Sequence, residues 1–243
     1  MSSRITSVLR APVFAAALVL LAVHAQAAVT QVGSAGALGA DDFFDWGQVR
    51  VVDGGGNAVA QSSPIIVTSN LARTGSISDG GSFTGLVEGT DWFGNFTVGN
   101  NVLYSGDPNN PFAAASAFTM NFNTPVAGLG LQITSNFYGA FTASLEVFDG
   151  AISLGTFNVG GTMDGNEDGT APFLGALSDS VDIDKAVFTL TSNTGAGLGV
   201  NRLLTSDTPT RTVPEPATLA LLTLALAALS LGQWRLRRSQ SGR

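Results

Sequence analysis

One segment near the middle of the chain constrains the fold more than any other. Residues 141–148 alternate apolar and polar side chains, which places the apolar ones on one face of an extended strand. Asp149-Gly150 follows, and residues 152–157 form a second β-rich run. An Asp-Gly pair between two such runs is a strong signal for a β-hairpin. The apolar face would carry Phe141, Ala143, Leu145 and Val147, opposite Thr142, Ser144 and Glu146.

Similar short runs recur between turn signals through the central part of the chain. They are residues 48–53, 64–68, 83–87, 93–98, 118–122, 129–134, 141–148, 152–159 and 187–191. Glycine makes up 30 of the 243 residues, and it interrupts every apolar repeat of helical spacing in this central part. Strand-sized runs at this spacing predict an all-β fold, a two-sheet jelly-roll-like sandwich. We expect one such domain at residues 28–205 and a Thr/Pro linker at 206–212.

The shortage of reactive side chains excludes several classes of function. The chain has no cysteine, and its one histidine, His24, lies in a segment that we expect to be removed. Ser-His-Asp and Cys-His catalysis, imidazole and thiolate metal sites, and His- or Cys-ligated haem are therefore excluded. Between residues 28 and 212, 17 acidic side chains against five basic ones give a net charge of −12. Such a surface repels nucleic acid, so no nucleic-acid partner is expected.

The N-terminal 27 residues have the pattern of a secretory signal peptide. Arg4 and Arg10 precede an apolar run at residues 11–23, which is too short to span a bilayer comfortably. Ala25 and Ala27 then form the small-x-small pattern that signal peptidase accepts. We expect cleavage after Ala27, and the alternative is an uncleaved N-terminal anchor.

The C-terminal end contains a proline motif, an apolar run and a basic tail. Residues 217–234 carry no charge, and their length of about 27 Å as a helix suits a thin membrane. The run predicts a transmembrane helix in the inner membrane, with the basic tail on the cytoplasmic side. The motif before it is Val213, Pro214, Glu215 and Pro216, and the tail contains Arg235, Arg237 and Arg238.

This C-terminal end at residues 213–238 resembles the PEP-CTERM protein-sorting signal of Gram-negative bacteria. The resemblance implies recognition by an exosortase, which is thought to cut near Pro214-Glu215-Pro216. It further implies export, first to the outer side of the inner membrane and then to the cell surface or beyond. Family members are typically associated with extracellular polysaccharide or biofilm matrix. A plain membrane anchor behind a proline linker is the alternative interpretation.

Short blocks in the central domain also resemble uncharacterised β-rich PEP-CTERM proteins, whose ectodomains have no activity that transfers to this chain. The blocks are residues 45–48, 91–96, 125–130, 173–175 and 199–201.

Residues 164–169 match the first half of a calcium-binding loop. Asp164, Asn166 and Asp168 supply oxygens at positions 1, 3 and 5, and Gly169 stands at position 6. Position 12 is Gly175 instead of a bidentate glutamate, so the segment is no EF-hand. Calcium is the one cofactor that the sequence suggests, and a solvated acidic turn explains the same residues.

Three kinds of function remain open for the ectodomain. Trp46 and Trp92 each follow an aspartate and would suit a lectin-like sugar platform if exposed, although a tryptophan in a sandwich is often part of the core. Carboxylates such as Asp91 and Glu146 would be needed for a glycosidase. Lys185, the only lysine, has no catalytic motif around it and is expected at a strand edge. We expect no enzyme, and a structural or polysaccharide-associated protein.

Overall fold

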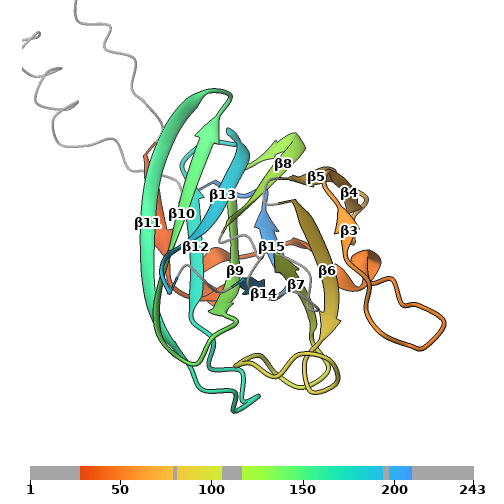
Figure 1. The fold of residues 1–243 in the computed structure, drawn as a ribbon. Coiled ribbons are helices and arrows are strands. Elements are labelled where there is room, and N and C mark those ends of the chain that lie inside the picture. Colours follow the sequence, from red (N-terminus) through yellow and green to blue (C-terminus); the bar gives the residue numbers. More distant parts are fainter. Residues whose placement is uncertain (1–27, 79–80, 106–116, 194–196, 210–243) are drawn as a thin grey trace, which may run out of the picture.

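The computed structural model describes residues 28–78, 81–105, 117–193 and 197–209, and these residues form two β-sheets packed on each other (Figure 1). Every strand pairing in these ranges is antiparallel. The helical elements there are one turn each, α2 (Ala35–Leu38) and the 3-10 turn η1 (Trp46–Val49). The prediction of an all-β fold built from two sheets is confirmed.

The larger sheet has nine strands among the described residues. The order of its main path is β1-β12-β9-β14-β7-β6-β3. Strand β15 lies off this path and pairs with β9 on one side and with the short strand β2 on the other. The strands are β1 (Val29–Val32), β2 (Asp42–Phe44), β3 (Gln61–Ser62), β6 (Ser82–Val87), β7 (Asn101–Ser105), β9 (Gly128–Ser135), β12 (Phe173–Ser178), β14 (Leu198–Val200) and β15 (Leu203–Ser206).

The smaller sheet has six strands within the same ranges, in the order β11-β10-β13-β8-β5-β4. They are β4 (Ile65–Thr68), β5 (Thr74–Ser78), β8 (Ala117–Val126), β10 (Gly139–Asp149), β11 (Ile152–Met163) and β13 (Ile183–Ser192). The predicted hairpin is confirmed, because β10 and β11 pair antiparallel around Gly150, whose φ of 57° is the left-handed conformation that glycine adopts readily.

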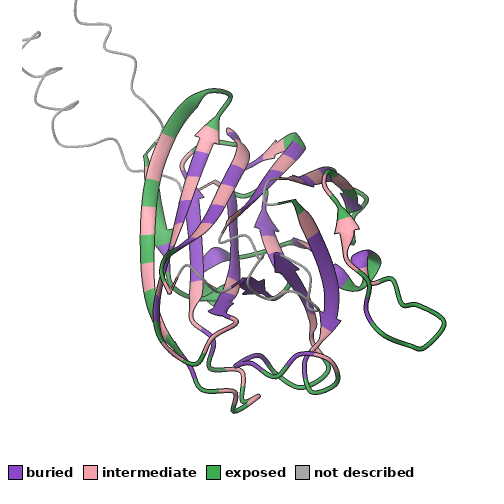
Figure 2. Cartoon of the chain, viewed as in Figure 1, coloured by how far each residue is buried: buried purple, intermediate pink, exposed green. Residues whose placement is uncertain are grey.

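The core lies between the two sheets and contains several contacts between aromatic rings. Phe83 on β6 meets Phe118 on β8 edge-to-face at 6.5 Å, and Phe118 stacks on Phe188 of β13 at 5.0 Å. Figure 2 shows buried residues alternating with partly exposed ones along the smaller sheet. On β10 the four apolar residues of the predicted face are at most 3% exposed, which confirms the alternation that the sequence predicted.

The predicted strand at residues 48–53 is wrong. The Asp45 carboxylate accepts a hydrogen bond of 2.8 Å from the Gly47 N–H and so starts the η1 turn. The Gln48 side chain continues this local bonding by donating to the Asp45 carbonyl. After the turn, Val51 and Val52 are nearly half exposed, and only an isolated bridge joins Val52 to Ala58.

The predicted strand at residues 93–98 is also wrong. This segment is a loop whose backbone bonds to a second loop at residues 164–171 instead of joining a sheet. The Ala171 N–H donates to the Asn95 carbonyl at 3.0 Å, and the Glu167 N–H donates to the Gly94 carbonyl at 2.9 Å. Hydrogen bonds to another loop thus replace a strand ladder here.

Candidate functional site

A pocket of about 310 Å³ opens where several strand ends and loops meet. The larger sheet contributes Leu86 of β6 and Tyr104 of β7. The remaining wall comes from the loop after β6, the turn between β9 and β10, and the end of β11. The lining residues are Leu86, Asp91, Trp92, Phe93, Tyr104, Asn136, Tyr138 and Met163.

Buried aromatic rings form the inner part of the pocket. Trp92 is 5% exposed and Tyr104 is 1% exposed, and their ring centroids lie 5.2 Å apart in a tilted arrangement. Asn136 donates a side-chain hydrogen bond of 3.3 Å to the Tyr104 hydroxyl group. Packing and hydrogen bonding therefore fix the positions of these two rings.

Two further aromatic rings at the pocket face solvent. Phe93 is 55% exposed and Tyr138 is 71% exposed. The Tyr138 hydroxyl comes so near Gly165 that a Cβ atom there would lie 2.7 Å from the oxygen. Because real Cβ atoms do not approach so closely, a glycine at position 165 is what lets this ring rest against the 164–169 loop.

The charge inside the pocket is neutralised. Asp91 forms an ion pair with Arg50 through one carboxylate oxygen, and its other oxygen accepts a hydrogen bond from the Val87 N–H. Both oxygens of this carboxylate are therefore engaged within the fold. The other polar groups of the lining are uncharged: the Asn136 amide, the hydroxyl groups of Tyr104 and Tyr138, and the indole N–H of Trp92.

Glu88, which forms an isolated backbone bridge with Trp92, is fully buried. Its Oε1 accepts a hydrogen bond of 2.5 Å from the Gly94 N–H, whereas its Oε2 and the Nε1 of Trp92 have no partner among the described residues. Burial raises the pKa of Glu88 to about 7, and nearby Glu167 adds to the rise, while backbone N–H groups of Gly94 and Phe96 oppose it. Nothing in the sequence pattern distinguished Glu88, because its burial arises from loop packing.

The structure places the three residues of the predicted calcium loop in a turn beside the pocket. Asp164 accepts hydrogen bonds from the Asn95 side chain and from the Asn166 N–H. The Asp168 carboxylate accepts one of 2.6 Å from the Thr170 hydroxyl, which with the Thr170 N–H holds the pKa of Asp168 below its usual range. No group of three or more acidic side chains within the described ranges has the arrangement of a metal site. Calcium binding here stays a prediction.

The other candidates lie in the η1 turn and on the smaller sheet. Trp46 is fully buried, and its indole Nε1 donates to the Asn201 carbonyl at 2.7 Å, so neither tryptophan is the exposed platform that we considered.

Glu146 on β10 accepts a hydrogen bond from Ser153 and does not line the pocket with Asp91. The predicted edge position of Lys185 is wrong, because Lys185 lies on β13, which pairs with β10 on one side and β8 on the other. Its Nζ atom lies 4.0 Å from the centre of the Phe148 ring. The exposed aromatics Phe93 and Tyr138 were missed because exposure depends on the loops that surround them.

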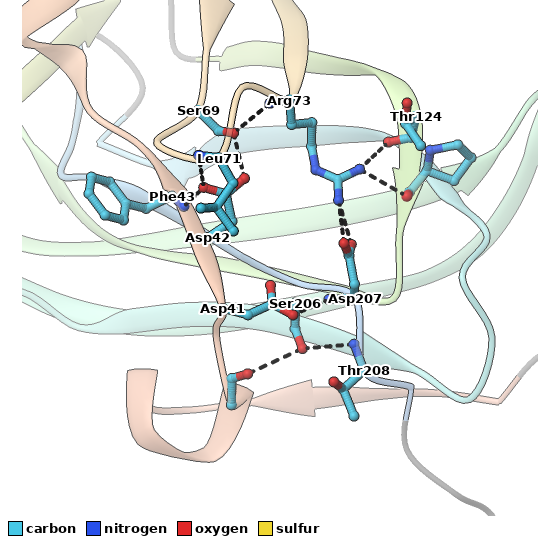
Figure 3. Close-up of polar contacts among 12 residues, drawn as sticks. Asp41, Asp42, Phe43, Ser69, Leu71, Arg73, Thr124, Ser206, Asp207 and Thr208 are labelled. Atoms are coloured by element: carbon cyan, nitrogen blue, oxygen red, sulfur yellow. Dashed lines mark hydrogen bonds and ion pairs between the residues drawn. The ribbon is translucent and has the colours of Figure 1, made fainter.

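A second polar cluster fastens the C-terminal strand to the fold (Figure 3). The Arg73 guanidinium points between the Asp207 carboxylate and the carbonyl oxygens of Thr124 and Pro125, with Arg73–Asp207 contacts of 2.5 and 2.7 Å. The Asp207 N–H in turn donates to Asp41 at 3.1 Å. We call Arg73 and Asp207 the C-terminal clamp. A hollow of about 260 Å³ beside it is lined by both members of the clamp and by Asp42, Leu71, Ala72 and Thr124.

The predicted signal peptide residues Ala25 and Ala27, the sorting motif 213–216 and the arginine tail lie outside the described residues. Among the residues that the structure describes, no helix has the length and apolar character needed to cross a membrane.

The fold and the pocket define a β-sandwich ectodomain with an aromatic-lined hollow between its loops. The C-terminal end is identified by its sequence, because residues 212–238 match the model of the PEP-CTERM protein-sorting motif. This match confirms the resemblance on which the prediction of export and exosortase processing was based. Such a motif implies an exported protein that is held at the membrane and sorted toward the cell surface.

Comparisons of the whole chain give much weaker likenesses. No curated protein sequence matches it. Solved structures with partial similarity include a GH87 α-1,3-glucanase catalytic domain in complex with tetrasaccharides, at 16% identity and a TM-score of 0.26, where the match covers 48% of this chain and 24% of that one. A family 6 carbohydrate-binding module matches at 10% identity and a TM-score of 0.27, covering 55% and 94%. The module CBM36 in complex with calcium and xylotriose matches at 12% identity and a TM-score of 0.24, covering 62% and 99%. Likenesses this remote carry no argument about function.

Proposed function

We propose that this chain is an exported, surface-sorted protein, processed by an exosortase, with a structural or polysaccharide-associated role in an extracellular matrix or biofilm. The observation that carries the proposal is the PEP-CTERM motif at residues 212–238. In this proposal signal peptidase cleaves after Ala27, and a helix at 217–234 holds the chain in the inner membrane until processing. The arginine tail stays in the cytoplasm by the positive-inside rule.

The sorting step is tested at the Pro214-Glu215-Pro216 segment. Proline keeps this segment out of the helix, so its peptide groups are open to a protease at the membrane boundary. We expect wild-type protein at the cell surface to end near this segment. Replacing all three residues with alanine should leave export intact but leave the chain membrane-bound and ending at Arg243. Mass spectrometry of the surface fraction measures the C-terminus.

Pro209→Ala is the matched control, because it changes a proline of the same linker region outside the motif. It should leave the processed C-terminus as in wild type. If wild-type surface protein ends at Arg243, the segment is an ordinary anchor and the sorting proposal is wrong.

We propose further that the ectodomain is not an enzyme and that its sandwich is jelly-roll-like. The chain passes repeatedly from one antiparallel sheet to the other, as jelly rolls do. Against a glycosidase, Asp91 is engaged by Arg50 and Val87, and Glu146 does not line the same pocket. A glycoside hydrolase activity that is lost in Asp91→Asn or Glu146→Gln would overturn the non-enzymatic proposal.

A lectin-like role is the second candidate, and one observation favours it. Exposed Phe93 and Tyr138 flank a pocket whose inner rings are held rigidly. Small-molecule sites are typically hollows of this kind, with apolar walls and a few fixed polar groups. Binding of the full chain to purified polysaccharides distinguishes this role from a purely structural one.

A further inference from the structure

We propose that the pocket lined by Trp92, Phe93, Asn136 and Tyr138 binds a neutral sugar unit of a polysaccharide chain. This inference rests on the proposed polysaccharide-associated function and names its binding site and its class of ligand. The first argument is size. A volume of about 310 Å³ lies at the small end of the range for ligand sites, which suits one short stretch of sugar rather than a large ligand.

The second argument is the chemistry of the walls. Phe93 and Tyr138 are both more than half exposed, although phenylalanine is among the residues most often buried. An aromatic face carries partial negative charge and attracts the positive edge of C–H bonds, such as those on one face of a sugar ring. Two exposed aromatic side chains at one hollow can provide a stacking surface for sugar rings.

The third argument concerns hydrogen bonding. The Tyr138 hydroxyl group and the Oδ1 atom of Asn136 accept and donate no hydrogen bond to the residues that the structure describes. The Asn136 amide is nevertheless held in place, because its Nδ2 donates to Tyr104 and its backbone N–H donates to the Gly197 carbonyl at 2.9 Å. A fixed acceptor and a hydroxyl beside aromatic faces match the hydroxyl groups of a sugar.

The fourth argument is charge, which selects a neutral ligand. The Asp91 carboxylate is paired with Arg50, so the lining offers neither a free cation for an acidic sugar nor a free anion for a basic one. The region from residue 28 to 212 carries a net charge of −12, which repels polyanions such as uronic-acid polymers.

The fifth argument is that the walls are preorganised. The loop that carries Trp92 and Phe93 is pinned to the 164–171 loop by the Asn95–Asp164 hydrogen bond and by the Ala171 N–H to the Asn95 carbonyl. Tyr138 rests against Gly165 of that same loop. Little ordering is then needed on binding, which favours affinity from a small contact area.

The test uses the full chain in a non-ionic detergent and affinity electrophoresis in gels that contain one polysaccharide each. The neutral probes are dextran, laminarin, galactomannan and arabinoxylan, and the acidic probes are alginate and polygalacturonate. We expect at least one neutral probe to retard the wild-type protein. Phe93→Ala and Tyr138→Ala should each weaken that binding, and the double variant should lose about tenfold or more.

Ile66→Ala is the matched control, because Ile66 is 70% exposed on β4 and does not line the pocket. It should bind as wild type does, and circular dichroism checks that all variants keep the β fold. If the wild type and the double variant are retarded equally, the pocket is not the site and the polysaccharide role survives. If only the acidic polysaccharides retard the wild-type protein, the proposal that the ligand is a neutral sugar is wrong. If no probe retards the wild type, the polysaccharide role itself is wrong.

Discussion

The carboxyl group of Glu88 is buried and stays protonated up to a pKa of about 7, above its ordinary value of 4.5. The folded state therefore holds this proton where the unfolded state has lost it, so stability falls as pH rises from about 4.5 through about 7. The full loss is on the order of 3 kcal/mol. Glu88→Gln, which cannot ionise, should flatten this decline. Urea unfolding at pH 5 and pH 8 measures the difference.

Glu146→Gln is the control for that experiment, since Glu146 lies on the partly exposed face of β10. It should show the wild-type dependence on pH. A Glu88→Gln variant that loses stability between pH 5 and pH 8 as steeply as wild type would contradict the assignment to Glu88.

Gly165 is a second residue whose environment makes a definite prediction. It has a φ of 71°, and a Cβ atom would lie 2.7 Å from the Tyr138 hydroxyl oxygen. Gly165→Ala should destabilise the fold by about 1–2 kcal/mol and displace the Tyr138 ring. Gly36→Ala is the control, because Gly36 in α2 has open space around it and an ordinary φ. Denaturant unfolding measures the unfolding free energy of both variants. Equal values would contradict the requirement for glycine at position 165.

Among the strands, β10 gives the clearest test of how the sheets are held together. Leu145 is fully buried between the sheets, while its neighbour Ser144 faces outward and is partly exposed. Leu145→Ala should cost about 2–5 kcal/mol of unfolding free energy, because it removes buried methyl groups and leaves a cavity. Ser144→Ala on the same strand should change stability by less than about 0.5 kcal/mol. Urea unfolding measures both, and similar costs would mean that the burial pattern is wrong.

Strands with a periodic pattern were predictable, whereas loops that imitate strands were not. The alternation at residues 141–148 and the Asp149-Gly150 turn predicted β10 and its hairpin correctly. Strict alternation of apolar and polar side chains indicates a strand with one buried face. Residues 93–98 have a similar content of apolar and β-branched residues, yet they form a loop held by residues 164–171. Bonds between segments that are about 70 residues apart leave no local trace in the sequence. Short strands such as β14 and β15 escaped prediction for the same reason.

At the scale of the whole molecule, the C-terminal clamp ties β15, the last strand that the structure describes, to the rest of the fold. The Arg73 side chain is only 11% exposed, and it holds β15 through Asp207 and the β8 carbonyls of Thr124 and Pro125. Arg73→Ala should cost about 1–3 kcal/mol and make β15 accessible to proteases. Arg202→Ala should cost less than about 1 kcal/mol, because the Arg202–Asp45 pair is exposed and 4.0 Å apart. Limited proteolysis with mass spectrometry compares cleavage near β15 in the two variants. Equal resistance to cleavage would contradict the role of Arg73 in holding β15.

The candidate site shows the same division between what is predictable and what is not. The sorting motif could be predicted because its parts, a proline motif, an apolar run and a basic tail, follow one another directly in the sequence. The pocket could not, since it joins residues 86 to 163 from both sheets. The sequence did point to Trp92 with its neighbouring aspartate, but it could not tell that Trp92 would be buried while Phe93 and Tyr138 remained exposed.

Strand β9 separates the pocket from the last strand that the structure describes. At its first residue, Gly128, it pairs with Ser206, the last residue of β15. At its other end, Ser135 leads into Asn136 and Tyr138 of the pocket. Eight residues of strand separate these two ends by roughly 24 Å. The pocket and residues 207–209, which follow β15, therefore lie at opposite ends of strand β9, so a ligand in the pocket would leave the C-terminal clamp uncovered.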